Sequence, residues 1–368
     1  MLKLFLYPFS LVYGIIIYFR NRLYDLKLLR SVEFDQPVIS VGNITVGGTG
    51  KTPHTEYLVD LLKDRFKIAT LSRGYKRRTS GFRLVEVEST AEEVGDEPLQ
   101  IKNKFPGITV AVCENRVTGI SHLLHSDPEN APDVVILDDA FQHRRIIPGI
   151  NILLVDYNRP VKKDILLPAG RLREGAAQIR RANVIIVTKC PEEITPIARR
   201  IMQKNVFLKP YQSIYFTSVE YGKLKHVFPS YDAEPEICGK RDYSILLVTA
   251  IAYSEGIRIF LQKISTDILE VEFRDHHYFT EKDIATIMNK FESLKVQKKI
   301  IVTTEKDAIR FRNMKNLPEE FRSVLYCLPI KVKFLDKEGT LFNQKIINYV
   351  GENKSNFSLH KRKNQPKT

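Results

Sequence analysis

A glycine-rich stretch near the start of the chain, TVGGTGKTP from Thr45 to Pro53, constrains the fold more than any other feature. Glycine lets the backbone take positive φ angles and approach a ligand closely, because it carries no Cβ atom. Proline is favoured in the first turn of a helix, where its missing N–H costs nothing. An apolar, β-branched segment precedes the stretch and an apolar helical pattern follows it, which together predict strand, loop and helix. Such a loop directs several backbone N–H groups, and the positive end of a helix, at one anion.

The rest of the chain continues this alternation of strands and helices. Near-continuous Val, Ile and Leu segments predict a doubly wound, mostly parallel α/β sheet of the P-loop NTPase type, covered on both faces. A polar, alternating stretch predicts a connecting ribbon, and a second, smaller α/β pattern follows it. We therefore expect an N-terminal membrane-associated helix at 1–30, the nucleotide-binding domain at 31–205, the ribbon at 206–230, the smaller domain at 231–350 and a basic, disordered tail at 351–368.

The N-terminal segment has an apolar run from Leu4 to Phe19 that Pro8 interrupts. The run is shorter than the roughly 20 residues of a full membrane span, and no small-residue cleavage site follows it. Basic residues come directly after it, which favours a helix lying in or dipping into a membrane surface with its cations on lipid headgroups. The alternative is a helix that packs on the protein's own core. The basic residues are Arg20, Arg22, Lys27 and Arg30.

The composition limits the possible partners. The formal net charge of +14 indicates an acidic partner, for which nucleic acid, anionic lipid headgroups and phosphorylated substrates all qualify. Aromatic residues are not interleaved with the basic runs as they would be on a stacking platform, which argues against single-stranded nucleic acid. The cysteines form no CxxC pair, which argues against a zinc site and favours a reducing environment. They are Cys113, Cys190, Cys238 and Cys327.

The glycine loop itself predicts a nucleotide site. The usual phosphate-loop pattern has glycine where this chain has Thr45, but the Gly47–Gly48 pair compensates and Lys51 and Thr52 are in place. Lys51 would reach the β- and γ-phosphates, and the Thr52 hydroxyl would hold Mg²⁺. The alternative is a glycine-rich turn with an incidental lysine. The predicted nucleotide-binding residues are Thr45, Val46, Gly47, Gly48, Thr49, Gly50, Lys51 and Thr52.

A pair of aspartates follows the apolar segment DVVILDD. Asp138 and Asp139 would lie at the carboxyl end of a buried strand, which is the edge where ligands bind in an open α/β sheet. A carboxylate there coordinates the Mg²⁺ of the nucleotide in phosphate-loop enzymes. An apolar run ending in two aspartates also fits a strand that ends in a turn. Combined with the glycine loop, the pair predicts a metal site.

Two further stretches carry candidates for proton transfer. Asp96 and Glu97 lie between Gly95 and Pro98, and a fixed aspartate could accept the proton of a hydroxyl that attacks a phosphate. The same pattern fits a helix N-cap with Glu97 in the first turn. In RDHHYF, His276 or His277 could enter a cleft and partner an acid, whereas a surface histidine pair is equally compatible with the spacing.

Four arginines are candidates for binding an acidic substrate group. Arg171 and Arg173 lie beside Pro168 and Gly170 in a stretch that these two residues restrain. The other two candidates, Arg73 and Arg116, come from basic stretches that equally describe solvated surfaces.

Several of these stretches together resemble the tetraacyldisaccharide 4′-kinase family, the lipid A 4′-kinases. They occur in the order of the family between Val38 and Asp307. The matching motifs are SVGNITVGGTGKTP, LSRGY, VGDEP, LDDAFQH, LLPAGRLRE, the DHH of RDHHYF, and TTEKDA.

The resemblance implies an enzyme that transfers the γ-phosphate of ATP to the 4′-hydroxyl of a tetraacyldisaccharide 1-phosphate and forms lipid IVA, in lipid A biosynthesis. It implies ATP and Mg²⁺ as cofactors, with Lys51 and Thr52 on the nucleotide and metal and with Asp138 and Asp139 on the metal and phosphates. Asp96 would accept the proton, with His276 as its partner. The resemblance also implies a peripheral or monotopic position on the cytoplasmic face of the inner membrane.

The expected partners are the acylated disaccharide lipid and anionic inner-membrane lipids, without nucleic acid or an obligate protein partner. The main alternative is a membrane-recruited regulatory ATPase of the partitioning type, which also uses a GGxGKT loop. That class carries a lysine just before the double glycine, where this chain has Val46. A nucleic-acid-binding NTPase is suggested only by the net charge.

Overall fold

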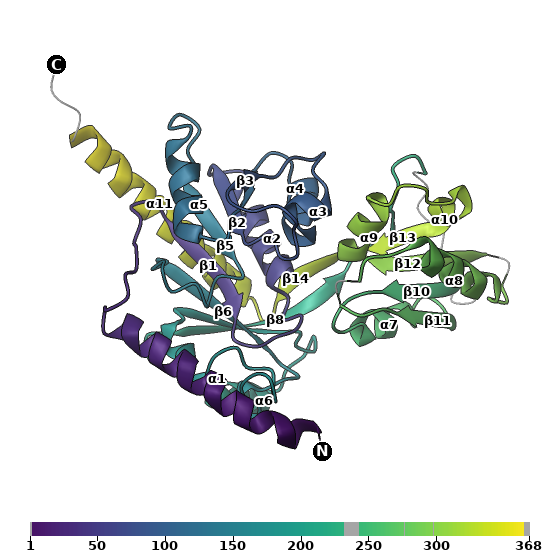
Figure 1. Ribbon diagram of the computed structural model, residues 1–368, viewed down its shortest axis with the longest axis horizontal. Coiled ribbons are helices and arrows are strands. Elements are labelled where there is room, and N and C mark those ends of the chain that lie inside the picture. Colours follow the sequence, from purple (N-terminus) through teal and green to yellow (C-terminus); the bar gives the residue numbers. More distant parts are fainter. Residues whose placement is uncertain (1, 232–242, 276, 297, 364–368) are drawn as a thin grey trace.

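The computed structural model describes the chain apart from residues 1, 232–242, 276, 297 and 364–368, and it contains two sheets (Figure 1). The larger sheet has nine strands in the order β14-β8-β7-β6-β1-β5-β2-β4-β3, and only its edge strands β14 and β3 pair in antiparallel fashion. The fold is therefore the expected mostly parallel, doubly wound α/β fold. Its strands are β1 (Val38–Asn43), β2 (Ile68–Ser72), β3 (Arg83–Leu84), β4 (Thr109–Val112), β5 (Val134–Asp138), β6 (Ile150–Asp156), β7 (Val184–Thr188), β8 (Ser213–Tyr221) and β14 (Ile330–Phe334).

The helices on the larger sheet bury their apolar faces against both of its sides. The central strands β1, β2, β5, β6 and β7 are buried along their whole length, as expected for a parallel sheet covered on both faces. One face carries α2 (Lys51–Leu62), α4 (Asp96–Lys104) and α11 (Glu338–Lys363). The other carries α5 (Arg116–His125) and α6 (Pro196–Asn205). Shorter helical segments are α3 (Ala91–Val94), η1 (Val161–Lys163) and η2 (Ala176–Arg181).

The smaller sheet has five strands in the order β11-β10-β12-β13-β9. Its strands are β9 (Lys225–His226), β10 (Ser244–Thr249), β11 (Asp267–Glu272), β12 (Lys299–Thr304) and β13 (Leu325–Leu328). Its helices are α7 (Glu255–Leu261), α8 (Glu281–Glu292), α9 (Glu305–Arg312) and α10 (Glu319–Val324). Residues of α8, α9 and α10 form the core on one face, and α7 packs on the other.

The carboxyl-terminal part of the chain departs from the expected organisation. β14 pairs with β8 in the larger sheet, and Phe342, Ile346 and Val350 of α11 enter the core of that sheet. The smaller domain therefore does not extend to residue 350 as expected, because the chain returns to the first domain at β14. The expected disordered tail is also corrected: α11 continues to Lys363, and residues 364–368 lie outside the described part.

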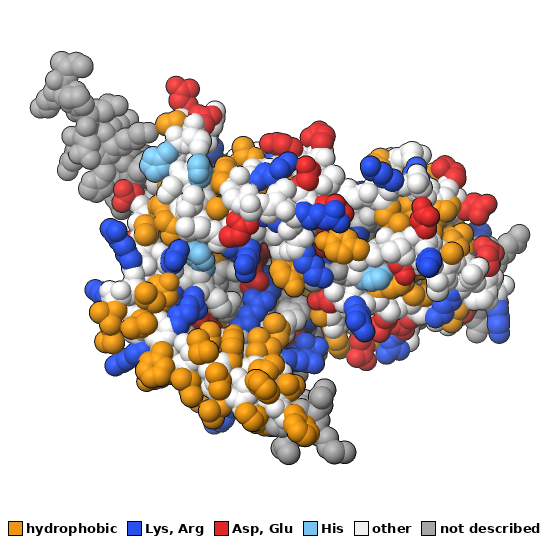
Figure 2. All heavy atoms as spheres, in the orientation of Figure 1, with side chains coloured by type: hydrophobic (Ala, Val, Ile, Leu, Met, Phe, Trp, Pro, Cys, Tyr) orange, Lys and Arg blue, Asp and Glu red, His pale blue; other side chains and the backbone are white. Residues whose placement is uncertain are grey.

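The N-terminal helix α1 (Leu2–Asp25) lies along the lower edge of the larger domain (Figure 1). Its inward side is polar: the Ser10 hydroxyl donates to the Leu166 carbonyl at 3.0 Å, and the Tyr13 hydroxyl donates to the Arg173 carbonyl at 2.8 Å. Its outward side is apolar, and Figure 2 shows it as a continuous hydrophobic patch bordered by Lys and Arg. Among the described residues, no helix combines the length and apolar character needed to cross a bilayer. The exposed apolar side chains are Phe5, Tyr7, Phe9, Leu11, Val12, Ile15, Ile16, Tyr18, Phe19 and Leu23.

Candidate active site

The glycine loop lies between β1 and α2, as the sequence predicts. Gly47 and Gly50 have φ angles of 108° and 85°, which is the left-handed region where a side chain would strain the backbone. The loop is fixed from inside, because the Asn43 amide donates to the Thr49 hydroxyl at 2.8 Å and the Thr188 hydroxyl donates to the Thr49 carbonyl at 3.0 Å. Lys51 is the first residue of α2. The N–H groups of the first turn and the positive helix end therefore face the position that a phosphate would take.

The predicted aspartates lie beside this loop. Strand β5, which ends at Asp138, is hydrogen-bonded to β1, and Val41 pairs with Asp138 in the register. The Asp139 carboxylate lies 3.7 Å from Lys51 Nζ and accepts hydrogen bonds of 3.0 Å on both oxygens from Arg173 Nη1. The structure therefore brings Lys51, both aspartates and Arg173 together at the carboxyl ends of neighbouring strands.

The two aspartates have opposite electrostatic environments. Asp138 is only 1% exposed, and burial raises its pKa to about 7, with the charges of Glu97 and Asp139 acting in the same direction. Burial also acts to raise the pKa of Asp139, but the charges of Lys51 and Arg173 prevail and hold it below its usual value. The neighbouring cations thus keep the Asp139 carboxylate ionised. The ionised form of Asp138 is disfavoured here, and a cation that arrives with a ligand would stabilise it.

The donor set fits Mg²⁺. The Thr52 hydroxyl and the Asp138 and Asp139 carboxylates are hard oxygen ligands. Among the described residues, the only recorded hydrogen bond to the Asp138 carboxylate comes from the Thr55 hydroxyl, at 3.2 Å. Among the described residues, no cluster of three or more His, Cys, Asp or Glu side chains could hold a metal without a ligand's help. Mg²⁺ is commonly held by one or two carboxylates together with substrate phosphates and water, a role that the Asp138 and Asp139 carboxylates fit.

The stretch LLPAGRLRE brings one of its two arginines to the site. The Arg173 guanidinium reaches Asp139, and the Arg173 N–H donates to the Ile44 carbonyl at 2.8 Å, just before the glycine loop. The carbonyl of Arg171 accepts from the Val46 N–H at 2.8 Å, but its side chain is exposed. Arg173 therefore joins the acid pair directly, whereas Arg171 contributes its backbone to the shape of the loop.

Arg116 and Arg73 lie within the electrostatic reach of the same site. Arg116 is 4% exposed and donates from Nη1 to the carbonyls of Cys113 and Glu114, while its Nε has no hydrogen-bond partner among the described residues. Burial lowers the pKa of Arg116 to about 10. The negative charges of Asp139 and Asp138 act to raise this pKa, whereas the positive charge of Arg73 acts to lower it further. The Arg73 side chain is exposed. A buried arginine of this kind is suited to an anionic ligand.

Asp96 begins helix α4 and faces the second domain. Both Asp96 and Glu97 lie in the first helical turn, as the helix alternative expected, although the N-cap position is taken by Gly95. Arg310 of α9 donates to Asp96 Oδ2 from Nε at 2.9 Å and from Nη2 at 2.6 Å. The charge of Glu97 acts on Asp138, so this helical turn and the acid pair share one electrostatic site. Asp96 therefore adjoins a residue whose charge reaches the acid pair, and its own carboxylate is anchored across the domain junction.

Arg310 and Asp307 are functional candidates that sequence reasoning missed. Arg310 Nη1 donates to Asp307 Oδ1 at 2.7 Å, and Asp307 Oδ2 accepts from the Ala250 N–H and the Thr304 hydroxyl. Asp307 lies in the TTEKDA motif, so its presence was noted without a role. The i, i+3 spacing of Asp307 and Arg310 in the sequence could have indicated the ion pair between them. It could not have indicated the contact of Arg310 with Asp96 in the other domain.

The histidines of RDHHYF are only partly accounted for. His276, the predicted partner of Asp96, lies outside the described residues. His277 Nε2 lies 3.0 Å from Asp283 Oδ2, which also accepts from the Thr280 N–H at the start of α8, and its ring stacks on Phe273 with centroids 4.7 Å apart. His277 therefore has a structural role at α8.

His54, on the first turns of α2, is a second residue that sequence reasoning missed. Its Nδ1 lies 2.7 Å from the Gly50 carbonyl and its Nε2 lies 3.1 Å from the Thr217 hydroxyl. Burial lowers the pKa of His54 to about 4, so the imidazole is neutral at pH 7. Because a carbonyl only accepts, Nδ1 carries the hydrogen and Nε2 accepts from Thr217. His54 thereby ties the glycine loop to β8, the strand that leads toward the second domain.

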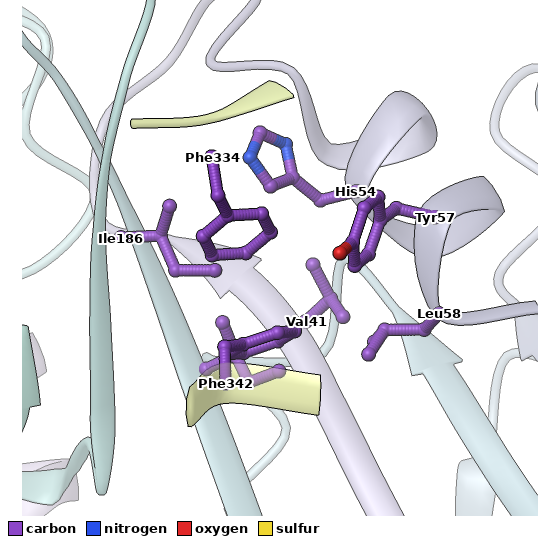
Figure 3. A pocket seen from close by; sticks show the side chains of 8 residues that line it. Val41, His54, Tyr57, Leu58, Ile186, Phe334 and Phe342 are labelled. Atoms are coloured by element: carbon purple, nitrogen blue, oxygen red, sulfur yellow. The ribbon is translucent and has the colours of Figure 1, made fainter. Parts of the chain in front are cut away.

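Figure 3 shows the pocket behind the glycine loop, where the rings of His54, Tyr57 and Phe334 lie close together above Val41. Its remaining space does not admit a water molecule, so this pocket is part of the packed core. The other lining residues are Leu58, Ile152, Ile186 and Phe342.

Several known proteins are similar to this chain over almost its whole length. A family model described as tetraacyldisaccharide-1-P 4′-kinase matches residues 2–349. A Bacteroides thetaiotaomicron protein named tetraacyldisaccharide 4′-kinase is 48% identical over 366 residues, which cover 98% of this chain and 96% of that protein. A Flavobacterium psychrophilum protein of the same name is 42% identical over 353 residues, covering 95% and 98%. A solved structure of LpxK from Aquifex aeolicus in complex with ATP matches with a TM-score of 0.72 and 32% identity, covering 95% of this chain and 99% of that one. The chain therefore belongs to the tetraacyldisaccharide-1-P 4′-kinase family.

Proposed function

We propose that this protein transfers the γ-phosphate of ATP to the 4′-hydroxyl of a tetraacyldisaccharide 1-phosphate and so forms lipid IVA in lipid A biosynthesis. The observation that carries the proposal is the convergence at the glycine loop. Lys51 Nζ lies 3.7 Å from Asp139, and the charge of Glu97, the residue after Asp96 in the first turn of α4, acts on Asp138. The family to which the chain belongs supports the choice of substrate.

Each group has a role that follows from its chemistry. Backbone N–H groups of residues 45–52 and the Lys51 ammonium hold the phosphates and offset negative charge on the transferring group. Mg²⁺, held by Thr52 with Asp138 and Asp139, supplies further charge neutralisation when bound. Asp96 accepts the proton of the attacking hydroxyl, and Arg310 fixes its carboxylate with two hydrogen bonds to one oxygen. His276 is the proposed partner of Asp96 and lies outside the described residues.

The arginines suit a substrate that carries phosphate. Arg173 and the buried Arg116 surround the acid pair and balance its charge, and Arg73 adds an exposed cation beside them. Arg171 remains a weaker candidate, because its side chain points to solvent. The alternative of a partitioning-type ATPase finds no support, since the family model spans residues 2–349 and Val46 replaces the lysine of that class.

We also propose that α1 holds the protein on the cytoplasmic face of the inner membrane, on anionic lipids. In a helix that packs on a protein core the apolar side faces inward, whereas in α1 the hydroxyls of Ser10 and Tyr13 face inward and the large apolar side chains face outward. A basic rim and the net charge of +14 complement anionic headgroups. The acyl chains of the substrate could then remain in the leaflet while its sugar enters the site.

The activity is tested by mass spectrometry of the product formed from ATP, Mg²⁺ and a tetraacyldisaccharide 1-phosphate. We expect a 4′-phosphorylated product, and Asp96→Ala should lower kcat by about 1,000-fold while the Kd for ATP stays unchanged. Lys51→Ala should impair ATP binding itself. Folded protein that forms no such product would contradict the proposed function, and equal losses of ATP affinity in both variants would remove the proton-acceptor role of Asp96.

Membrane attachment is tested by sedimentation with phosphatidylglycerol vesicles. Replacing Phe9 and Ile16 by Asp places charges on the outward face of α1 and should abolish binding. Ile259→Asp, a charge at an exposed position of α7 in the smaller domain, is the matched control and should leave binding unchanged. Vesicle binding that survives the α1 substitutions would contradict the proposed anchor.

A further inference from the structure

Helix α6 and the turn that follows it carry large apolar side chains on the surface of the larger domain. Met202 is the one buried residue of α6, all of which the structure describes, so these side chains add little to the core beneath the helix. Soluble proteins rarely expose several large apolar side chains together unless another surface covers them. We name this surface the α6 patch, and its apolar members are Ile197, Ile201, Phe207 and Tyr211, all exposed.

The backbone at Phe207 has a conformation that large side chains rarely adopt. Phe207 has a φ of 51° and directly follows the last residues of α6. Its N–H donates to the Lys204 carbonyl at 3.3 Å, and the Leu208 N–H donates to the Gln203 carbonyl at 3.3 Å, which is the Schellman ending of a helix. Glycine usually takes this position, because a Cβ atom strains the left-handed backbone. The Phe207 ring is nevertheless half exposed, so burial in its own chain offsets little of this strain.

The α6 patch lies at the same lower edge of the larger domain as α1 (Figure 1). The Tyr211 hydroxyl donates to the Arg180 carbonyl at 2.7 Å, and Arg180 pairs with Asp25, the last residue of α1, at 2.6 Å. The core beneath α6 is also packed against Leu166, whose carbonyl accepts from the Ser10 hydroxyl of α1. The outward apolar side of α1 and the α6 patch therefore belong to elements that rest on the same part of the domain.

Cations surround the apolar side chains of the α6 patch. Lys162 Nζ lies 5.7 Å from the centroid of the Phe207 ring. The other exposed cations are Arg200, Lys204 and Lys209. An exposed acidic pair, Glu192 and Glu193, precedes α6 at the end of the helix away from Phe207. Apolar side chains bordered by lysine and arginine suit a surface of acyl chains and anionic headgroups, where long basic side chains reach the phosphates.

We propose that the α6 patch is a second contact with an anionic lipid surface, an inference that rests on the proposed attachment through α1. A single helix that lies in a membrane surface leaves the protein free to roll about the long axis of that helix. A second contact beside the helix stops this rolling and fixes the direction in which the candidate active site faces the lipid. Ile197, Ile201 and the Phe207 ring enter the acyl boundary, while the cations bind lipid phosphates.

The contact is tested first by fluorescence. The chain contains no tryptophan, so a single introduced tryptophan reports only on its own position. Phe207→Trp keeps an aromatic ring in the patch, and vesicles of phosphatidylglycerol with brominated acyl chains should quench its emission about two-fold. Ile259→Trp on α7 is the matched control, because Ile259 and Phe207 are both 50% exposed, and its emission should not be quenched. Unquenched Phe207→Trp in protein that sediments with the vesicles overturns the second contact.

The second test measures affinity for phosphatidylglycerol vesicles. The double variant Ile197→Asp/Phe207→Asp suits the local backbone, since Ile197 lies in the first turn of α6, where an acidic side chain favours the helix, and Asp tolerates a positive φ. The variant should bind the vesicles about ten-fold more weakly, with an unchanged midpoint of urea denaturation. Vesicle affinity within two-fold of the wild type overturns the proposal.

The outcomes separate this inference from the proposed anchor. A wild-type protein that does not bind the vesicles contradicts the anchor and the second contact together. If the substitutions of Phe9 and Ile16 abolish binding while Phe207→Trp is unquenched, the anchor through α1 stands and only the second contact fails. If the wild type is dimeric by sedimentation velocity, and Ile197→Asp/Phe207→Asp is monomeric with unchanged vesicle affinity, the α6 patch joins two copies of the chain and the lipid contact is overturned.

Discussion

The two halves of the site are built in different ways. The phosphate half comprises the glycine loop, Lys51, Asp138 and Asp139, which come from adjacent strands of one sheet and from the helix that follows β1. The junction half comprises Asp96, Asp307 and Arg310, and it joins residues 214 positions apart in two domains. The phosphate half is thus a local structure that strand order assembles. The junction half exists only when the two domains are packed together.

The halves also differ in exposure. In the phosphate half Asp138 is buried, but the Asp139 side chain is 31% exposed, so a ligand can reach it. The side chains of Asp96, Asp307 and Arg310 are 11%, 0% and 4% exposed. Buried charges are tolerated only when all their partners are present, and removing one leaves the others uncompensated. We therefore expect changes in the phosphate half to affect ligands most, and changes in the junction half to affect both stability and turnover.

Among the substitutions that test stability, the largest effect is expected for Arg310→Gln. The substitution leaves Asp307 buried without its cation, and the free energy of unfolding should fall by about 3 kcal/mol. Since Asp96 also loses two hydrogen bonds, kcat should fall about 100-fold with the Kd for ATP unchanged. Urea denaturation and steady-state kinetics measure these quantities. Arg258→Gln, at a partly exposed ion pair of α7, is the control and should cost less than about 1 kcal/mol. A loss of ATP affinity equal to the loss of kcat would erase the distinction between the halves.

The next effect concerns the pH dependence of stability in the phosphate half. The pKa of His54 is about 4 in the folded protein and 6.5 in the unfolded chain, so the folded state binds fewer protons between these values. His54 therefore contributes stability that is fully present above pH 6.5 and is lost as the pH falls toward 4, up to about 3 kcal/mol. His54→Gln should flatten this part of the pH profile of unfolding, whereas His125→Gln, at an exposed position, should not. An unchanged profile in His54→Gln would contradict the assigned neutral state.

The smallest effect is expected behind the glycine loop. The Tyr57 hydroxyl donates to Asn343 Oδ1 at 2.8 Å, beside the pocket of Figure 3. Tyr57→Phe removes this one hydrogen bond and keeps the ring, so the free energy of unfolding should fall by about 1 kcal/mol. ATP affinity should stay within two-fold, as calorimetry can measure. A larger loss of ATP affinity would mean that α11 supports the loop more directly than its packing indicates.

The division of the site into a local phosphate half and a junction half that spans two domains also explains which residues could be predicted from the sequence. The glycine loop, Lys51 and the Asp138–Asp139 pair were found because neighbouring residues and strand periodicity determine them. Arg310 was missed because its partner Asp96 is remote in sequence. His54 was missed although it directly follows the quoted glycine stretch, because its partner Thr217 is 163 residues away. Periodicity identified most strands, but it carries no information on which sheet a strand joins. For this reason β14 was assigned to the wrong domain.

One consequence follows from the way α1 is seated on the larger domain. Tyr13 of α1 donates to the carbonyl of Arg173, whose guanidinium in turn orients Asp139 beside Lys51. A variant that lacks the first 25 residues, made so that no detergent is needed, would therefore also lose the hydrogen bond from Tyr13 to Arg173. That loss would weaken the support of the Asp139 carboxylate, which faces the metal site. Inactivity of such a truncated enzyme would say nothing about lipid attachment, and only substitutions on the outer surface of the helix can separate the two effects.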